Sequence, residues 1–202
     1  MKNFSSFILI WVLSVLSFCI WLEYSSEMML AYDWAYQNGI TTQDSIEKAN
    51  MKWRITRAEL AKMISNYSIN VLWMERDESR DCIFLDVSDE FDEKYGYWIM
   101  YSCQLWLMGQ NIEEFKPNNF VTRAEFGTVL SRVLWWSRNE WGSTYYENHL
   151  RALKSVWIMN NISVPMDNEI RGYVMLMLMR SMDADLELGD DNQIFEVLQL
   201  LD

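Results

Sequence analysis

Two arginines occupy the same place in two copies of one short pattern, and the chemistry they offer is anion recognition. Arg57 lies in ITRAEL at residues 55–60, and Arg123 lies in VTRAEF at residues 121–126. A planar guanidinium can donate to both oxygens of one carboxylate, and the free backbone amides at the start of a helix also favour an anion. Ligand binding is therefore the favoured role for both arginines. The alternative is an ion pair with a neighbouring acidic side chain.

A third, weaker copy of the pattern follows. Arg171 lies in EIRGYV at residues 169–174, at a comparable distance from a position where a helix is expected to stop. The three stops are Gly39, Trp106 and Trp157, which precede the three arginines by 18, 17 and 14 residues. Self-similarity of this kind indicates a repeat protein. For Arg171, an ion pair is favoured over ligand binding.

Helices with defined starts are the elements that would hold these arginines. A Thr followed three residues later by Glu predicts a capping box, in which each side chain accepts from the backbone N–H of the other residue. The capping residues are Thr56 with Glu59 and Thr122 with Glu125. Apolar residues then recur at spacings of three and four, as in an amphipathic helix. The third copy lacks the box, and its apolar segment 173–179 predicts a helix buried on every side.

A shorter helix is expected before each of these longer ones. We expect the shorter helices over residues 27–38, 94–105 and 145–156, with polar, turn-rich loops between the elements. The expected fold class is mainly α, built from three helix-loop-helix repeats. The repeats are placed at residues 27–75, 82–136 and 143–182, followed by an acidic C-terminal tail at 183–202.

Composition narrows the function classes that suit this chain. Half of its 202 residues are apolar or aromatic and 23% are charged, so it can bury a core and is not disordered. The net charge of −12 argues against a nucleic-acid partner, which needs a basic face. One histidine and three cysteines, with no CxxC or HExxH spacing, argue against a metal site. His149 shows no Ser or Cys partner in the sequence, so we expect a structural histidine, no cofactor and no enzyme.

The amino-terminal segment is expected to direct the chain out of the cytoplasm. Lys2 is the only charged residue before Glu23, and residues 7–22 form an apolar run that only two serines interrupt. This pattern predicts a signal peptide or signal anchor over residues 1–22. Cleavage is favoured over retention, and lipidation at Cys19 is disfavoured because bulky Phe18 precedes it.

The two later cysteines leave two alternatives open. Outside the cytoplasm, Cys82 and Cys103 could be oxidised to a disulfide. Two buried free thiols are the favoured interpretation at this point.

The longest run of linked motifs carries a family resemblance. FLDV at 84–87 precedes a helix that ends in LWLMG at 105–109, and FKPNNFVTRAEF follows at 115–126. This order resembles the S-layer homology family. The match is close in the second repeat, fair in the first and partial in the third, and it spans about residues 27–182.

The resemblance implies both a fold and a function. It implies a pseudo-threefold bundle whose second helices meet at the centre, with grooves between repeats that bind an anionic cell-wall polysaccharide or a peptidoglycan-linked polymer outside the cell. The ligand-contacting arginine of the family corresponds to Arg57, Arg123 and Arg171. The chain is then a non-catalytic anchor at the cell surface, attached to a membrane only if residues 1–22 are retained. The alternative is a secreted or membrane-tethered interaction or adhesion module without glycan binding.

Tryptophan stands where glycine is expected. The chain has eleven Trp and seven Gly, and two of its three helix stops are Trp, although glycine is the usual residue there. We therefore hypothesise that several tryptophans are glycines, encoded by UGA codons that this gene reads as Gly. Alternatively, they are genuine tryptophans that pack between repeats or form platforms for sugar rings. Trp34 and Trp135 fit apolar helical positions and are expected to be genuine. Besides the two stops, the positions in question are Trp53, Trp73, Trp98 and Trp136.

Overall fold

The computed structural model describes residues 24–184, and this part of the chain is mainly α-helical, without strands. The expected signal segment 1–22 and nearly all of the tail 183–202 lie outside the described residues. The helices are α2 (Ser26–Gln37), α3 (Arg57–Asn66), α4 (Asp89–Lys94), α5 (Trp98–Gln104), α6 (Arg123–Trp135), α7 (Glu147–Ser155) and a last helix over 171–184. A π-helical turn, Tyr67–Val71, continues α3, and a 3-10 turn, Trp136–Asn139, follows α6. None of the helices described is long and apolar enough to cross a membrane.

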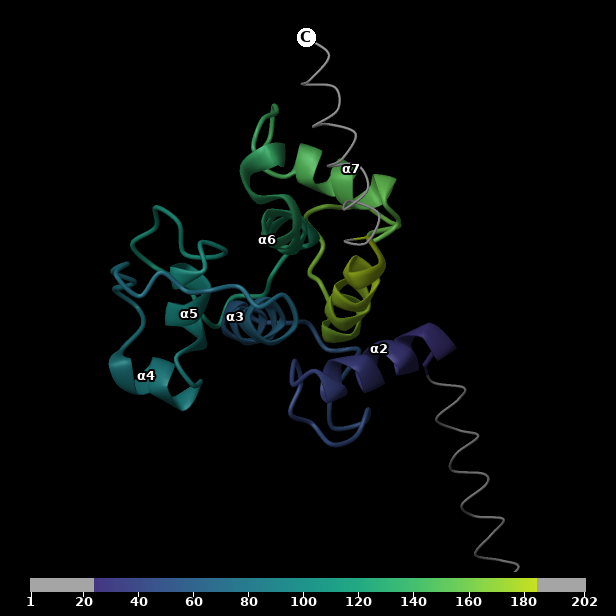
Figure 1. Cartoon of the computed structure of the whole chain (residues 1–202), viewed down its shortest axis with the longest axis horizontal. Coiled ribbons are helices and arrows are strands. Elements are labelled where there is room, and N and C mark those ends of the chain that lie inside the picture. Colours follow the sequence, from purple (N-terminus) through teal and green to yellow (C-terminus); the bar gives the residue numbers. More distant parts are fainter. Residues whose placement is uncertain (1–23, 185–202) are drawn as a thin grey trace, which may run out of the picture.

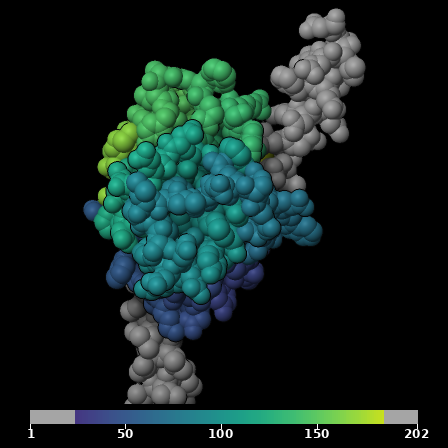
Figure 2. Space-filling model, turned by 90° about the vertical axis from the view of Figure 1, so that its left-hand side faces the viewer, coloured from purple at the N-terminus to yellow at the C-terminus, as the bar shows by residue number. Residues whose placement is uncertain are grey.

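The helices that begin at Arg57, Arg123 and Arg171 lie at the centre, and the helices that precede them lie outside. Figure 1 shows α3, α6 and the helix 171–184, drawn in yellow, close together in the middle of the molecule. The helices α2, α5 and α7 are placed around this group on three different sides. Figure 2 shows the face that the teal segment with α4 and α5 covers, between the green and the purple parts of the chain.

Two of the central helices begin at the expected capping boxes. In α3 the Thr56 hydroxyl accepts from the N–H of Glu59, whose carboxylate accepts from the N–H of Thr56. In α6, Thr122 and Glu125 form the same reciprocal pair. The central burial expected for 173–179 holds for Val174, Met175, Leu176, Met177 and Leu178, whereas Tyr173 is exposed.

The three outer helices end in one and the same backbone geometry. Gly39, Trp106 and Trp157 have φ values of 68°, 62° and 62°, so all three are left-handed, as the alignment of helix stops predicts. In each case the next residue donates its N–H back to a carbonyl near the helix end, as in a Schellman-type C-cap. These bonds are Ile40 to Ala35 at 2.8 Å, Leu107 to Ser102 at 3.0 Å and Ile158 to Leu153 at 3.0 Å.

The helix expected over 94–105 is present but shorter, as α5 (Trp98–Gln104), and a separate helix, α4 (Asp89–Lys94), precedes it. Gly96 and Tyr97 take left-handed conformations with φ of 74° and 60°, and they separate α4 from α5. The Asp92 carboxylate, buried in α4, then accepts from the N–H groups of Ile99 and Met100 and so caps α5. Burial raises the pKa of Asp92, while these two hydrogen bonds lower it.

Three residues from distant parts of the chain join their backbones in a closed ring. The N–H of Ile55 donates to Glu169, that of Glu169 donates to Val121, and that of Val121 donates to Ile55, over 3.1, 2.8 and 3.0 Å. The three central helices start just after these residues, and the first N–H groups of each are bound by a loop from elsewhere in the chain. Those bonds are Arg57 to Asn119, Ala58 to Pro117, Arg123 to Asp167, Ala124 to Pro165, Arg171 to Trp53 and Gly172 to Met51.

Cys82 and Cys103 form a disulfide, so the favoured prediction of two free thiols is wrong. The bond ties the loop before α4 to the end of α5, across a sequence separation of 21 residues. The sequence could not select this pair over two buried thiols, because the choice depends on the 6.0 Å between the two Cα atoms, a distance that a disulfide requires.

Candidate functional site

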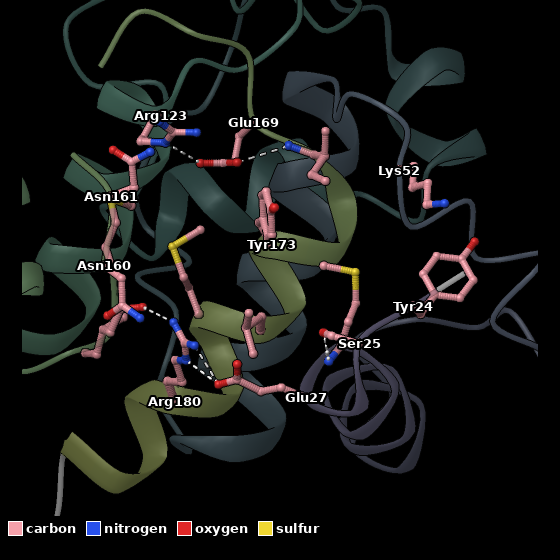
Figure 3. Close-up of a pocket in the computed structure, with 16 residues that line it drawn as sticks. Tyr24, Ser25, Glu27, Lys52, Arg123, Asn160, Asn161, Glu169, Tyr173 and Arg180 are labelled. Atoms are coloured by element: carbon pink, nitrogen blue, oxygen red, sulfur yellow. Dashed lines mark hydrogen bonds and ion pairs between the residues drawn. The ribbon is translucent and has the colours of Figure 1, made fainter. Parts of the chain in front are cut away.

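A groove with a cavity of about 530 Å³ lies between the helix 171–184, α2 and the loop 158–161. We call it the α2 groove. Figure 3 shows Tyr173 near its middle, Arg123 and Arg180 along one side, and Tyr24 and Lys52 at the other. Asn160 and Asn161 add amide groups to the lining. Amides, aromatic rings and cations together suit a polar ligand with ring faces and negative charge.

Each arginine of the α2 groove is held by an acidic side chain of the protein itself. Arg180 pairs with Glu27 of α2, with its Nε and Nη2 at 2.7 and 2.6 Å from the same carboxylate oxygen. Its Nη1 also donates to the carbonyl of Ile158 at 3.4 Å. The Glu27 side chain is about half exposed, so this carboxylate can move away from Arg180 into water.

Arg123 pairs with a carboxylate that is almost fully buried. Its Nε lies 3.2 Å from Glu169 Oε2, while Glu169 Oε1 accepts from the N–H of Ile170. Burial raises the pKa of Glu169, and the nearby Arg123 charge opposes that rise. Glu169 belongs to the backbone ring, where the corresponding residues, Ile55 and Val121, are apolar and fully buried.

A second groove, with a cavity of about 360 Å³, lies between α6, the loop 107–112 and the residues just before α7. We call it the α7 groove. Arg57 enters it and donates to Glu125 at 3.1 Å and to the Phe115 carbonyl at 2.7 Å. Tyr145 lines the same cavity, and burial is the main cause of its raised pKa.

The α7 groove has its own arginine on the central helix. Arg132 donates to both carboxylate oxygens of Glu140, at 2.5 and 3.0 Å. This hydrogen-bonded ion pair lowers the pKa of Glu140. Arg132 is nine residues after Arg123, and Arg180 is nine residues after Arg171. Arg132, the second arginine of the first pair, lines the α7 groove. Arg180, the second arginine of the other pair, lines the α2 groove.

The three arginines predicted to bind ligand are brought to equivalent contacts, but not to equivalent cavities. Arg57 lines the α7 groove and Arg123 lines the α2 groove. Arg171 pairs with Glu59 and donates to the Ala49 carbonyl at 2.9 Å, and it lines neither of these two grooves. All three are thus engaged in ion pairs, the alternative role that the sequence left open. Sequence reasoning assigned no role to Arg132 or Arg180, although their common spacing was the available signal.

His149 has partners that the sequence does not reveal. Its Nδ1 lies 2.9 Å from the hydroxyl of Ser131 on α6, and its Nε2 lies 3.9 Å from Glu140. Both His149 and Ser131 are fully buried, so a substrate cannot reach this pair. Burial is the main cause of the lowered pKa of His149. Across the described range, His, Cys, Asp and Glu side chains form no group of three or more that could hold a metal ion.

Comparison of the sequence with models of known protein families gives no match, and comparison with curated proteins gives none either.

Proposed function

We propose that this protein is a non-catalytic cell-surface module of the S-layer homology type, which binds an anionic cell-wall polysaccharide or a peptidoglycan-linked polymer. In this proposal the three repeats at 27–75, 82–136 and 143–182 surround an approximate threefold axis. The grooves between repeats receive the polymer. The observation that carries the proposal is the matched lining of the α2 and α7 grooves. Each groove has one arginine from the start of a central helix, Arg123 or Arg57, and one from within the following central helix, Arg180 or Arg132.

The backbone contacts support three equivalent repeats. The ring of Ile55, Val121 and Glu169 takes one residue from each of them. Each arginine at a central-helix start reaches an acid of the next copy: Arg57 to Glu125, Arg123 to Glu169, and Arg171 to Glu59. The third copy has Tyr173 where the others have the capping glutamate, and Arg123 uses Glu169 instead. Contacts of this kind, which link the last copy to the first, are expected of a closed ring of repeats.

The chemistry of the α2 groove supports an anionic sugar polymer as its ligand. Carboxylate groups on a sugar can take the place of Glu27 against Arg180, because both present the same oxygens to the guanidinium. Tyr173 offers a ring face to a sugar, and Asn160 and Asn161 offer hydrogen bonds to hydroxyl groups. Glu27 thus acts as an internal competitor for the site that the ligand occupies.

The expected location outside the cytoplasm rests on the segment 1–22 and on the oxidised cysteines. Disulfides persist mainly in oxidising compartments, so the Cys82–Cys103 bond is weakly consistent with an extracellular protein.

Co-sedimentation of the mature protein with purified cell walls tests the proposal. Arg180→Ala and Arg57→Ala should each weaken binding by about ten- to a hundredfold, since a hydrogen bond to a charged group contributes on the order of 1.5–3 kcal/mol. Glu27→Gln should strengthen binding, because it removes the competing carboxylate. Arg151→Ala is the matched control, since Arg151 is exposed and pairs with Glu147 on its own helix. Equal sedimentation of all four variants, with folding verified by circular dichroism, would refute glycan binding in these grooves.

One observation favours a second candidate, an interaction or adhesion module without glycan binding. The groove arginines are already paired with acidic side chains of the same chain. Such ion pairs can hold the repeats together without binding any ligand. This candidate predicts that cell walls do not sediment the protein and that Glu27→Gln changes nothing in that assay.

A further inference from the structure

Four tryptophans adopt backbone conformations that belong to glycine. Trp73, Trp106, Trp136 and Trp157 have φ values of 59°, 62°, 55° and 62°. Side chains with a Cβ rarely enter this region, because the Cβ crowds the neighbouring carbonyl, and bulky residues are outliers there. Glycine has no Cβ and adopts these angles freely.

This feature is specific to tryptophan among the aromatic residues. Nine tryptophans lie within residues 24–184, and four of them have positive φ. Fifteen tyrosines and phenylalanines lie in the same range, and Tyr97 alone among them has positive φ. A general tolerance of aromatic side chains in this fold would have affected both groups alike.

Trp136 occupies the most restrictive conformation of the four. Its φ of 55° is combined with a ψ of −131°, close to the first central position of a type II′ turn, where glycine is dominant. Asparagine and aspartate enter the ordinary left-handed region more readily than other residues, but the ψ of Trp136 lies outside that region. The end of α6 therefore calls for glycine itself.

The helix stops provide an internal comparison. Gly39 ends α2 with the same φ and the same returning hydrogen bonds that Trp106 and Trp157 have after α5 and α7. The chain thus uses glycine at one of three equivalent positions and is written with tryptophan at the other two.

The four indoles contribute little to the core. Trp73 and Trp157 are 82% and 77% exposed, and Trp106 and Trp136 are about half exposed. Trp106 makes one defined contact, with the Arg80 guanidinium 3.5 Å from the centre of its ring. Burial of the side chains therefore gives no compensation that would explain tryptophan at strained positions.

A positive φ separates these four residues from the other described tryptophans. Trp34 lies in the helical interior of α2, where its ring packs against Tyr67 at 6.2 Å between centroids. Trp53, Trp98, Trp135 and Trp141 have no positive φ. Backbone geometry thus gives no reason to replace them, including Trp53 and Trp98, which the sequence placed in question.

We propose that the natural protein carries glycine at positions 73, 106, 136 and 157, because its gene reads UGA codons as glycine. Translation of those codons as tryptophan gives the chain as written. The pocket that Trp106 and Trp136 line together with Arg132 and Glu140 is then a product of this reading, and it is not a platform for sugar rings.

Peptide sequencing by mass spectrometry of the protein isolated from its own cells tests this proposal. We expect glycine at all four positions and tryptophan at position 34, with UGA codons at the four and UGG at codon 34. Tryptophan in the natural protein at any of the four positions overturns the proposal. Glycine at position 34 as well would overturn the backbone criterion, because the criterion assigns tryptophan there. The test does not depend on glycan binding, so its outcome is independent of the proposed function.

Discussion

Arg57 and Glu125 join two central helices through a carboxylate that serves both of them. Glu125 Oε1 accepts from Arg57 Nη1 at 3.1 Å, while its Oε2 accepts from the N–H of Thr122 at 2.8 Å and closes the capping box of α6. Glu59 has the same double role between Arg171 and Thr56. The glutamate that caps one central helix therefore also binds the arginine at the start of another central helix.

Glu125→Ala should lower the free energy of unfolding by about 1–3 kcal/mol, because it removes an N-terminal cap and a partly buried ion pair together. Urea denaturation followed by circular dichroism measures the change. Arg151→Ala is the control, because Arg151 is exposed and pairs with Glu147 one turn away on the same helix, so its loss should cost no more than about 0.5 kcal/mol. An equal effect of the two variants would mean that the shared carboxylate adds nothing.

Arg123→Ala should destabilise the protein by about 3–5 kcal/mol, because it leaves the buried Glu169 carboxylate without its counter-ion. Adding Glu169→Val, which copies the apolar Val121 of the same ring, should recover most of that loss. Thermal unfolding of the single and double variants checks both expectations.

The pH dependence gives a further check on the Arg123→Ala variant. The pKa of Glu169 is already raised above its usual 4.5, and without Arg123 it rises further. The folded variant then holds a proton that the unfolded chain loses above about pH 4.5, so its stability decreases as the pH rises through the folded pKa. Its deficit relative to the parent protein should therefore shrink in acid. A deficit that is the same at every pH would contradict this explanation.

His149 should make the protein less stable as the pH falls below about 6.5. Burial lowers the pKa of His149 from 6.5, with Glu140 opposing the shift and Arg132 adding to it. The unfolded chain therefore takes up a proton at a higher pH than the folded chain does, which favours unfolding until the pH reaches the folded pKa. His149→Asn should remove this contribution. Parallel stability curves for the two proteins between about pH 7.5 and pH 5 would contradict it.

The paired substitution Trp106→Gly with Trp157→Gly should raise stability, since a left-handed residue with a Cβ costs roughly 1–2 kcal/mol at each position. Trp34→Gly is the contrasting variant, and it should lower stability through the loss of packing and about 1 kcal/mol of helix propensity. Melting temperatures of the three proteins test this. An equal or lower value for the paired variant would count against strain at the helix stops.

The sequence predicted those features that local chemistry determines. The capping boxes at Thr56 and Thr122 follow from residues three apart, and the stops at Gly39, Trp106 and Trp157 follow from alignment of the copies. The separate helix α4 was missed, because its separation from α5 depends on the left-handed Gly96 and Tyr97 and on the Asp92 carboxylate binding the start of α5.

The candidate site was less predictable, because its ion pairs join residues far apart in the chain. Arg57 and Glu125 are separated by 68 residues, and Arg171 and Glu59 by 112. Several acidic residues lie at comparable distances in the sequence from each of these arginines. Which of them becomes the partner in the ion pair is decided by the folded backbone. The spacing that Arg132 and Arg180 share was visible in the sequence, but which cavity each would face was not.

The ring of Ile55, Val121 and Glu169 limits how this architecture could change by gene duplication. An open solenoid can be lengthened by further units, because its two ends are free or are covered by special terminal units. Here the backbone N–H and carbonyl group of each ring residue are already hydrogen-bonded to the other two ring residues. If the chain consists of three repeats, as we propose, a fourth repeat could be inserted only by opening this ring, so closure would fix their number.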